Sequence, residues 1–301
     1  MKDIIIIGGG PAGLTAAVYA LRSGKSVLLF EKISYGGQIS KSHLVENYPA
    51  IKSISGFDFS MNLYNQAKDF GCEFKRAEVI EVIDDKIKTV KTNRESFQAK
   101  AVIFALGCEP KKSGLEKENA YIGRGVSYCA VCDGNFYKNK DVAVVGGGNT
   151  AIQDAIYLSE LCNKVYLIHR RDTFRAQPNI VQQLKSISNV ELVLNSVPVD
   201  ITGENLVGGI KIKNTLTDEI KEISVSGIFF AIGQIPPTEK FKNILSTDSY
   251  GYITADDSCK IRDGIYVCGD CRSKKVRQLT TAVSDGTVAS IEACEYIDST
   301  N

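Results

Sequence analysis

The sequence predicts an α/β protein with two similar domains, the second inserted into the first. Three observations support this class. Two segments share one pattern, an apolar strand, a glycine-rich turn and a helix, and their turns begin about 138 residues apart. A further short apolar strand follows each segment, which is the order of a βαβ unit in a parallel sheet. The length of 301 residues also corresponds to about two domains.

Both patterns can be followed along the chain. The first is a strand at 4–7, the turn Gly8-Gly9-Gly10-Pro11-Ala12-Gly13, a helix at 14–22 and a strand at 27–30. The second is a strand at 142–145, the turn Gly146-Gly147-Gly148-Asn149-Thr150-Ala151, a helix to about residue 161 and a strand at 165–168. The sequence therefore predicts two Rossmann-like dinucleotide-binding domains.

Two more predicted strands mark the crossings between the domains. Strands at 101–105 and 227–231 end in small-residue turns, and prolines follow at Pro110 and at Pro236-Pro237. Because proline stiffens a connection, we place the crossings there. The first domain is then expected to contain residues 1–111 and 240–301, and the inserted domain residues 112–239.

The composition argues against several classes of protein. Thirty-six basic and 35 acidic residues leave a net charge of +1, which argues against a nucleic-acid-binding protein. No run of about 18 apolar residues occurs, and the N-terminal apolar run is too short for a signal peptide. We expect no membrane span and a cytoplasmic location, where a disulfide would be catalytic rather than structural.

The first glycine turn predicts a dinucleotide site. Gly8 allows a tight turn, Gly10 lets the backbone approach a pyrophosphate, and Gly13 permits close helix packing. Glu31, at the end of the next strand, can accept hydrogen bonds from a ribose. An ordinary glycine turn before a helix is the alternative.

The second glycine turn predicts a different dinucleotide. Ala151 replaces the third glycine, and the following strand ends in His169-Arg170-Arg171, with Arg175 four residues further on. Guanidinium groups at this place suit the 2′-phosphate of NADP by charge and by bidentate geometry. The alternative is a solvated cationic turn.

A Cys-x-x-Cys sequence, Cys129-Ala130-Val131-Cys132, precedes the second glycine turn and predicts a dithiol/disulfide couple. One thiol would act as the nucleophile, and Asp133 could protonate a leaving thiolate. A second pair, Cys268 and Cys271, leaves two alternatives. One is a second redox pair, and the other is zinc, although about 135 residues separate the two pairs instead of the usual 15 to 20 or so. We expect no metal, and we expect the other cysteines to be packing residues.

Several stretches together resemble a known family. They are IIIIGGGPAGLTAA, GGQIS followed by VENYP, GVSYCAVCDG, VVGGGNTA, HRRDTFRA and GDCRSKKVRQLTTAVSDG. In this order and spacing, essentially the whole chain resembles the low-molecular-weight bacterial thioredoxin reductases. The resemblance implies a homodimeric flavoenzyme that passes electrons from NADPH through FAD to a disulfide and then to thioredoxin or a thioredoxin-like protein.

The resemblance also implies roles for individual residues. Cys129 and Cys132 would form the redox disulfide, with Cys132 facing the flavin and Asp133 as the proton donor. Asn47 would lie near the flavin ring, Asp270 at the ribityl chain, and Arg277-Gln278 at the polar edge of the flavin. The residues assigned to FAD are Gly8, Gly10, Ala12, Gly13, Glu31, Lys32, Gly37, Gln38, Asn47, Gly107, Asp270, Arg277, Gln278 and Leu279. The residues assigned to NADPH are Gly146, Gly148, Asn149, Thr150, Ala151, Gln153, His169, Arg170, Arg171 and Arg175.

Two positions depart from the family pattern. Val131 stands where the family usually has threonine, so a hydroxyl near the disulfide is absent. Gln153 stands where the family's helix carries a glutamate close to the nicotinamide. An amide can hydrogen-bond a carboxamide, but it brings no negative charge, so the efficiency of hydride delivery is the property this change affects.

Three other functions stay open beside thioredoxin-disulfide reductase. They are a relative supplied with electrons by ferredoxin, a dithiol oxidase of the same fold, and a flavin-dependent redox sensor that only binds a partner. The stretches GGGNTA and HRRDTFR match the family here, which favours NADPH over ferredoxin. The disulfide and the NADPH site would share the inserted domain, so we expect that domain to swivel on its two connections.

Overall fold

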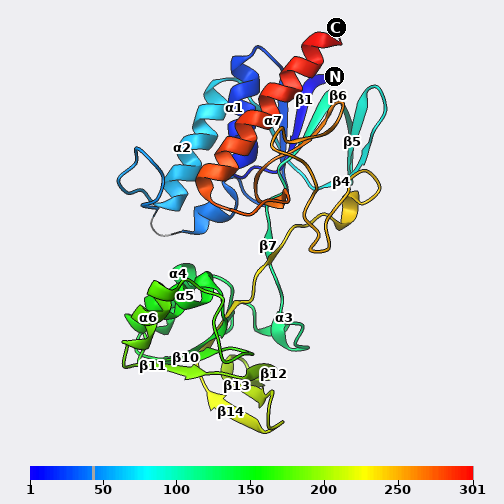
Figure 1. Ribbon diagram of the computed structural model, residues 1–301. Helices are drawn as coiled ribbons and strands as arrows, with labels where there is room; N and C mark the ends of the chain where they lie inside the picture. Colours follow the sequence, from blue (N-terminus) through cyan, green and yellow to red (C-terminus); the bar gives the residue numbers. More distant parts are fainter. Residues whose placement is uncertain (43–44, 301) are drawn as a thin grey trace. The chain divides into compact units, whose positions relative to one another are not determined.

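The computed structural model describes residues 1–42 and 45–300. The chain divides into an outer unit, Met1–Glu109 with Ile235–Asn301, and an inserted unit, Pro110–Gln234 (Figure 1). These boundaries fall two and five residues before the expected residues 112 and 240. The reason is that two short strands, β7 (Glu109–Pro110) and β16 (Gln234–Ile235), pair with each other, so that both crossings occur at this pair.

The outer unit is built on an eight-stranded sheet. Its main path runs β17-β18-β6-β1-β2-β3, and β4 joins through β5, which pairs with β6. The central strand β1 pairs in parallel with both β2 and β6, as the predicted βαβ unit requires. The strands are β1 (Lys2–Ile7), β2 (Val27–Glu31), β3 (Glu73–Arg76), β4 (Val79–Ile83), β5 (Lys88–Thr92), β6 (Ser96–Phe104), β17 (Lys260–Arg262) and β18 (Ile265–Val267).

Three helices cover one face of this sheet (Figure 1). They are α1 (Pro11–Arg22), α2 (Gly56–Asp69) and α7 (Leu279–Ser299), and α7 packs along α1. Ile4 and Ile6 of β1 belong to the core beneath the helices, whereas Ile5 and Ile7 belong to the core on the opposite face. This alternation is the two-residue period of a strand buried on both faces, and it explains the continuous apolar run.

The inserted unit repeats the plan with a five-stranded parallel sheet in the order β11-β10-β9-β15-β8. Its βαβ unit is β9, α5 and β10. The strands are β8 (Val126–Ser127), β9 (Asp141–Gly146), β10 (Lys164–Ile168), β11 (Val190–Val193) and β15 (Gly227–Ala231). The helices are α3 (Glu118–Tyr121), α4 (Ala130–Asp133), α5 (Asn149–Ser159) and α6 (Pro178–Lys185).

Different layers cover the two faces of this second sheet. Val142 and Val144 pack in a core that includes α5 and α6, whereas Ala143 and Val145 pack in a core that includes a small antiparallel sheet. That small sheet contains β12 (Ser196–Gly203), β13 (Val207–Asn214) and β14 (Ile220–Ser224). The predicted α/β class with two parallel βαβ units is confirmed.

Two helix boundaries differ from the sequence prediction. Helix α1 begins at Pro11 instead of residue 14, because proline lacks the N–H that is unpaired at a helix start and its φ angle is already helical. Helix α5 ends at Ser159, two residues before the expected residue 161. Within residues 1–42 and 45–300, every helix is too short or too polar to cross a bilayer.

Candidate functional site

The structure places the predicted site residues in two groups. Every residue assigned to FAD lies in the outer unit. Every residue assigned to NADPH lies in the inserted unit, together with Cys129, Cys132 and Asp133. Each glycine turn joins the first strand of a βαβ unit to its helix, β1 to α1 and β9 to α5.

The N-terminus of α1 leaves backbone donors for a phosphate. Gly10 is the N-cap residue and has no side chain with which to cap the helix. The amide groups of Ala12 and Gly13, in the first turn, therefore have no acceptor within the helix. Amide groups at such a position, together with the positive end of the helix dipole, bind anionic phosphates.

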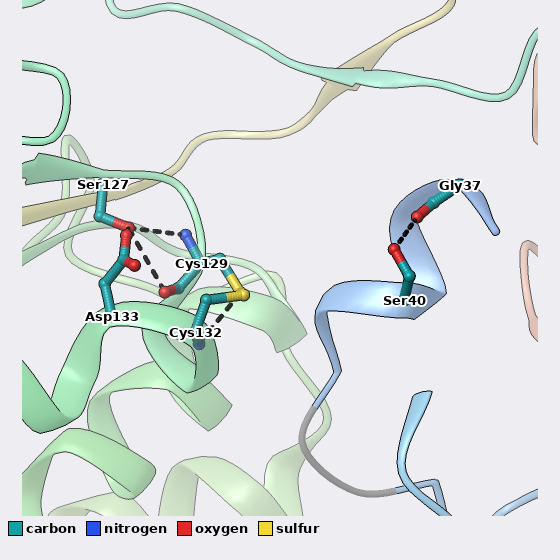
Figure 2. Close-up of a disulfide and its surroundings, with 6 residues drawn as sticks. All are labelled: Gly37, Ser40, Ser127, Cys129, Cys132 and Asp133. Atoms are coloured by element: carbon teal, nitrogen blue, oxygen red, sulfur yellow. Dashed lines mark hydrogen bonds between the residues drawn. A yellow bond between two sulfur atoms is a disulfide. The ribbon is translucent and has the colours of Figure 1, made fainter. Parts of the chain in front are cut away.

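A second glycine keeps the backbone open beside this helix start. Gly37 begins the short helix η1 (Gly37–Lys41), in which Ser40 Oγ donates to the Gly37 carbonyl at 2.7 Å (Figure 2). A Cβ atom on Gly37 would lie 2.9 Å from Gly10 Cα, so the two backbones approach with no side chain between them. This cradle fits a group that runs close to main chain, as a pyrophosphate does.

Glu31 is held at the end of β2 by two backbone amides. Its Oε2 accepts from Gly9 N and its Oε1 accepts from Ile33 N, each at 2.9 Å. A carboxylate oxygen has a further acceptor site after one hydrogen bond, so Glu31 can still accept from the two hydroxyls of a ribose. The neighbouring Lys32 forms an ion pair with Glu109 instead of facing this carboxylate.

Asp270 provides an unsatisfied buried acceptor. It lies in the short helix η4 (Gly269–Cys271), and its Oδ1 is buried without a hydrogen-bond partner in the described part of the chain. The nearest cation is Lys274, whose Nζ is 3.9 Å from that oxygen, and burial raises the pKa of Asp270. Buried polar atoms are almost always hydrogen-bonded, so this oxygen fits a hydroxyl donor on a bound ligand.

Arg277 and Gln278 are fixed by contacts within the protein. The Arg277 guanidinium lies 3.6 Å from the ring centre of Tyr252 and donates from Nε to the Asp270 carbonyl at 3.1 Å. Gln278 caps α7 and exchanges hydrogen bonds with Thr281, and Asn47 Nδ2 donates to Gln278 Oε1 at 3.3 Å. The structure therefore brings Asn47, Gln278 and the N-terminal residue Leu279 of α7 together.

The remaining predicted residues of this group lie beside the same loops. Gln38 Nε2 donates to the Cys108 carbonyl at 3.2 Å, which places Gln38 next to the end of β6. Gly107, the residue before Cys108, has a positive φ angle of 63° and open space where a Cβ would lie. The outer unit thus gathers backbone donors at a helix start, the carboxylate of Glu31 and the buried carboxylate of Asp270, a set of groups that fits FAD.

The second glycine turn is tied to the arginine segment by three contacts. Arg175 N donates to the Gly147 carbonyl and Gln177 N donates to Asn149 Oδ1, both at 2.8 Å. The His169 ring covers Gly147 so closely that a Cβ there would lie 2.1 Å from Cε1. Gly148 caps α5 without a side chain, so the first-turn amides, including those of Thr150 and Ala151, remain donors for a phosphate.

The arginines of this segment carry its positive charge. Arg170, Arg171 and Arg175 are exposed, and none of them forms an ion pair within the described residues. His169 is only 7% exposed, and its Nε2 lies 3.0 Å from the Thr173 carbonyl. Burial lowers the pKa of His169, and the nearby arginine charges lower it further, so His169 is neutral at pH 7. An open cluster of three guanidinium groups suits a phosphate ligand.

Cys129 and Cys132 form a disulfide across one helical turn, with the Cα atoms 5.3 Å apart. Cys129 is the N-cap of α4, and its Sγ accepts a hydrogen bond from Cys132 N at 3.2 Å (Figure 2). Both cysteines are partly exposed. Thiol–disulfide exchange requires that an attacking thiolate reach one of the two sulfur atoms, so partial exposure is compatible with it.

Ser127 links Asp133 to the disulfide segment. Its hydroxyl is 2.6 Å from Asp133 Oδ2 and accepts from Cys129 N at 3.1 Å (Figure 2). Sequence reasoning missed Ser127, although it lies two residues before Cys129 and is a polar residue on a short apolar strand. The hydrogen bond fixes the carboxyl group of Asp133 close to the backbone of the redox pair.

The second Cys-x-x-Cys pair lies in the other unit. Cys268 and Cys271 are completely buried in the outer unit, and Cys271 Sγ donates to the Cys268 carbonyl at 3.3 Å. Burial raises the pKa of the Cys271 thiol to about 12 and raises that of Cys268 well above its usual value. Thiols with such pKa values are poor nucleophiles at pH 7.

Comparison with known proteins places the chain in a family. The model of the pyridine nucleotide-disulphide oxidoreductases matches residues 2–286. The chain belongs to this family. The thioredoxin reductase of Bacillus subtilis (strain 168) is 41% identical over 299 residues, which are 98% of this chain and 95% of that protein.

Solved structures of the family have the same fold. The thioredoxin reductase of Lactococcus lactis matches with a TM-score of 0.92 at 37% identity and covers 99% of this chain and 100% of that one. The enzyme of T. acidophilum matches with a TM-score of 0.89 at 34% identity and covers 100% and 99% of the two chains. Family membership confirms the predicted oxidoreductase class and the cofactors FAD and NADPH.

Proposed function

We propose that the protein is an NADPH-dependent thioredoxin-disulfide reductase. The observation that carries the proposal is the partly exposed Cys129–Cys132 disulfide in a chain that also has two separate glycine turns of the dinucleotide-binding kind. Two nucleotide sites and one disulfide are the parts needed to move two electrons from a nicotinamide through a flavin to the disulfide of an acceptor. The relatives named thioredoxin reductase support thioredoxin, or a thioredoxin-like protein, as that acceptor.

In this proposal the outer unit binds FAD. The amides of Ala12 and Gly13 hold the pyrophosphate in the cradle of Gly10 and Gly37, and Glu31 accepts from the ribose of the adenosine. Asp270 accepts a hydroxyl of the ribityl chain through its unpartnered Oδ1. Bound FAD supplies the two-electron acceptor for a hydride and the donor to the disulfide.

The inserted unit binds NADPH. The amide groups at the start of α5 hold the pyrophosphate, and Arg170, Arg171 and Arg175 hold the 2′-phosphate by charge-assisted hydrogen bonds. His169 stays neutral and keeps the arginine segment against Gly147. Gln153 is exposed on α5, where its amide can hydrogen-bond the carboxamide of a nicotinamide.

Two electrons and two protons convert the disulfide into a dithiol. Asp133, held by Ser127, is the group that exchanges a proton with the thiol pair. The Cys132 amide that donates to Cys129 Sγ would stabilise a thiolate on Cys129, so Cys129 attacks the disulfide of thioredoxin and releases one of its thiolates. Cys132 then attacks the mixed disulfide, which reforms the Cys129–Cys132 bond and releases reduced thioredoxin.

The proposal includes a homodimer in the cytoplasm, which rests on the resemblance to the family. Light scattering of the purified protein tests the homodimer, for which a mass of about twice 32.8 kDa is expected. A monomer of full activity would contradict the dimer without affecting the electron pathway.

The deciding experiment measures NADPH oxidation, under anaerobic conditions, with thioredoxin disulfide as acceptor. The variant Cys132→Ser should lose this turnover by at least about a thousandfold, in line with removal of an obligatory covalent group. Reduction of the flavin by NADPH, followed by visible absorbance, should persist because it precedes disulfide chemistry. Cys162→Ser, which alters a buried cysteine in the same unit, should behave like the wild-type protein.

The other functions predict different results in the same assay. Turnover with reduced ferredoxin and none with NADPH would indicate the ferredoxin-dependent type. Oxygen consumption with a dithiol substrate would indicate an oxidase, and the absence of any turnover would indicate a sensor. Thioredoxin reduction by Cys132→Ser at the wild-type rate would contradict the proposed disulfide pathway.

A further inference from the structure

A cluster of buried charges lies directly behind Asp270. Asp285 of α7 is surrounded by Arg272 and Lys274, and the side chains of all three are at most 9% exposed. None of these three residues was assigned to a site from the sequence. Charged side chains are seldom buried this completely, and they are then paired, as these three are. The question is what this buried charge cluster does.

The carboxylate of Asp285 is fully used by its neighbours. Its Oδ2 accepts from Gly269 N at 3.1 Å, from Arg272 Nε at 3.1 Å and from Lys274 Nζ at 3.0 Å. Its Oδ1 accepts from Arg272 Nη2 at 3.0 Å, and Arg272 Nη1 donates to the Asp256 carbonyl at 2.9 Å. Asp285 therefore fixes both cations and one backbone amide at once.

The amide that Asp285 fixes belongs to the turn that carries Asp270. Gly269 is the first residue of η4 and Asp270 is the second. Lys274 lies between the two carboxylates, because its Nζ is 3.0 Å from Asp285 Oδ2 and 3.9 Å from the unpartnered Asp270 Oδ1. Asp285 thus holds both the backbone amide that precedes Asp270 and the cation nearest to the Asp270 carboxylate.

The same part of α7 also contacts the first glycine turn. A Cβ on Gly286, next to Asp285, would lie 2.2 Å from the Ala12 carbonyl, and one on Gly269 would lie 2.8 Å from Ala12 Cβ. Helix α7 therefore packs tightly against the start of α1 (Figure 1). The cluster connects the turn that carries Asp270 to the helix start that presents the phosphate-binding amides.

A gain in stability is a weak explanation for such a cluster. Removing charges from water carries a large free-energy penalty, and the attraction between the charges offsets it only when the geometry is good. Replacing a buried ion pair by apolar residues is often neutral or stabilising, so stability alone does not account for these three charges. The contacts made by Asp285 all lead to η4 or to residues that border it.

We propose that Asp285 is a positioning residue for the flavin: through Gly269, Arg272 and Lys274 it holds the Asp270 carboxylate toward a hydroxyl of FAD. The inference rests on the proposed function, since it takes FAD as the ligand of the outer unit. In this inference Asp285, Arg272 and Lys274 do not contact the reacting atoms. Asp285 therefore affects FAD affinity only through Asp270. A double-mutant cycle of the two residues measures this dependence.

The test measures the dissociation constant of FAD for the full-length apoprotein by flavin fluorescence, and the apoprotein's stability by thermal unfolding. Asp285→Asn should weaken FAD binding at least tenfold, and Asp270→Asn by a similar or larger factor. The double variant should bind FAD within threefold of Asp270→Asn alone.

A matched control is Asp84→Asn, because Asp84 is also a carboxylate between two cations, Lys88 and Arg262, in the same unit. It should lower stability and leave the FAD affinity within twofold of wild type.

Two results would overturn the positioning role. One is an Asp285→Asn variant that is less stable but binds FAD within twofold of wild type, because the cluster would then be only structural. The other is a double variant in which the two losses multiply, because Asp285 would then act independently of Asp270. If Asp285→Asn does not fold, Lys274→Met is judged by the same cycle, with a loss of at least threefold expected and an unchanged affinity contradicting the proposal. Failure of the wild-type protein to bind FAD would overturn the proposed function and this inference with it.

Discussion

Asp154 is a carboxyl group that the protein holds in an unfavourable environment. It lies on α5, is partly buried, and has no hydrogen-bond or ion-pair partner within the described residues. Burial raises its pKa to about 7. The folded state therefore favours the protonated form, whereas the unfolded chain has the ordinary aspartate pKa.

The consequence is a pH dependence of stability with a definite sign. A raised pKa in the folded state favours folding below the pKa of the unfolded chain, and this contribution is lost as the pH rises toward 7. Asp154→Asn, which resembles the protonated form, should match the wild-type protein near pH 4 and exceed it above pH 7. Three pKa units set an upper limit of about 4 kcal/mol for the difference.

Urea unfolding of the inserted unit at a series of pH values measures this difference. Glu160→Gln, at the exposed end of the same helix, is the matched control and should show no comparable trend. A constant difference between Asp154→Asn and wild type across this pH range would contradict the assignment of the shift to Asp154.

Gly147 and Gly148 are neighbours with different reasons to be glycine. A Cβ on Gly147 would strike the His169 ring, whereas one on Gly148 would meet nothing within 4 Å. Gly147→Ala should therefore lower the melting temperature of the inserted unit and raise the KM for NADPH, because His169 and the arginine segment must move. Gly148→Ala should leave the melting temperature unchanged and raise the KM, because the methyl group points to open space that the pyrophosphate would take.

Thermal unfolding without nucleotide and steady-state kinetics with NADPH separate the two variants. An unchanged melting temperature in Gly147→Ala would mean that His169 adapts to the added methyl group without cost. An unchanged KM in Gly148→Ala would mean that the pyrophosphate does not pass close to this backbone.

At the scale of elements, the loop that carries Asn47 contains a strained residue. The loop is closed by backbone hydrogen bonds between Val45 and Ile54, and Tyr48 packs against Phe59 with ring centres 5.0 Å apart. Within it Ala50 has a φ angle of +69°, in the left-handed region that favours glycine. The closing contacts hold the loop in this conformation against the preference of Ala50.

A series of substitutions at this position measures the strain. Ala50→Gly should raise the free energy of unfolding of the outer unit by about 1 kcal/mol, because glycine adopts this φ angle without a steric penalty. Ala50→Val should lower it by more than that, because a β-branched side chain rarely adopts a positive φ. Equal stability of the three proteins in urea would show that the loop relaxes freely.

At the scale of the whole molecule, the two units have separate hydrophobic cores and separate sheets. We expect calorimetry of the apoprotein to resolve two transitions, because each unit has its own core. FAD should stabilise only the outer unit and NADP⁺ only the inserted unit. A ligand at 100 times its dissociation constant should stabilise its unit by about 2.7 kcal/mol.

Variants assign the two transitions independently of the ligands. Gly147→Ala should shift only the transition that NADP⁺ raises, and Ala50→Gly only the transition that FAD raises. If FAD raised the temperature of the transition that Gly147→Ala shifts, FAD would bind the inserted unit, which would contradict the proposed assignment of the two cofactors. The swivel of the inserted unit on its two connections stays a prediction.

The sequence by itself was sufficient for the features that depend on local pattern. The strand, turn and helix of each βαβ unit were predicted within three residues at most boundaries, because apolar runs, glycines and prolines act on the backbone of their own neighbours. The same holds for the Cys129–Cys132 pair, whose spacing along the chain is itself the signal.

Other features depended on residues that are far apart in the sequence. Asp285 lies 16 residues after Gly269, and no local pattern indicates that its carboxylate meets that amide together with two cations. The contact of the His169 ring with Gly147 and the positions of the domain crossings likewise depend on residues far apart in the sequence. Burial and long-range packing determine them, so the sequence determined which chemical groups the protein has, and only the tertiary structure decided which of them face one another.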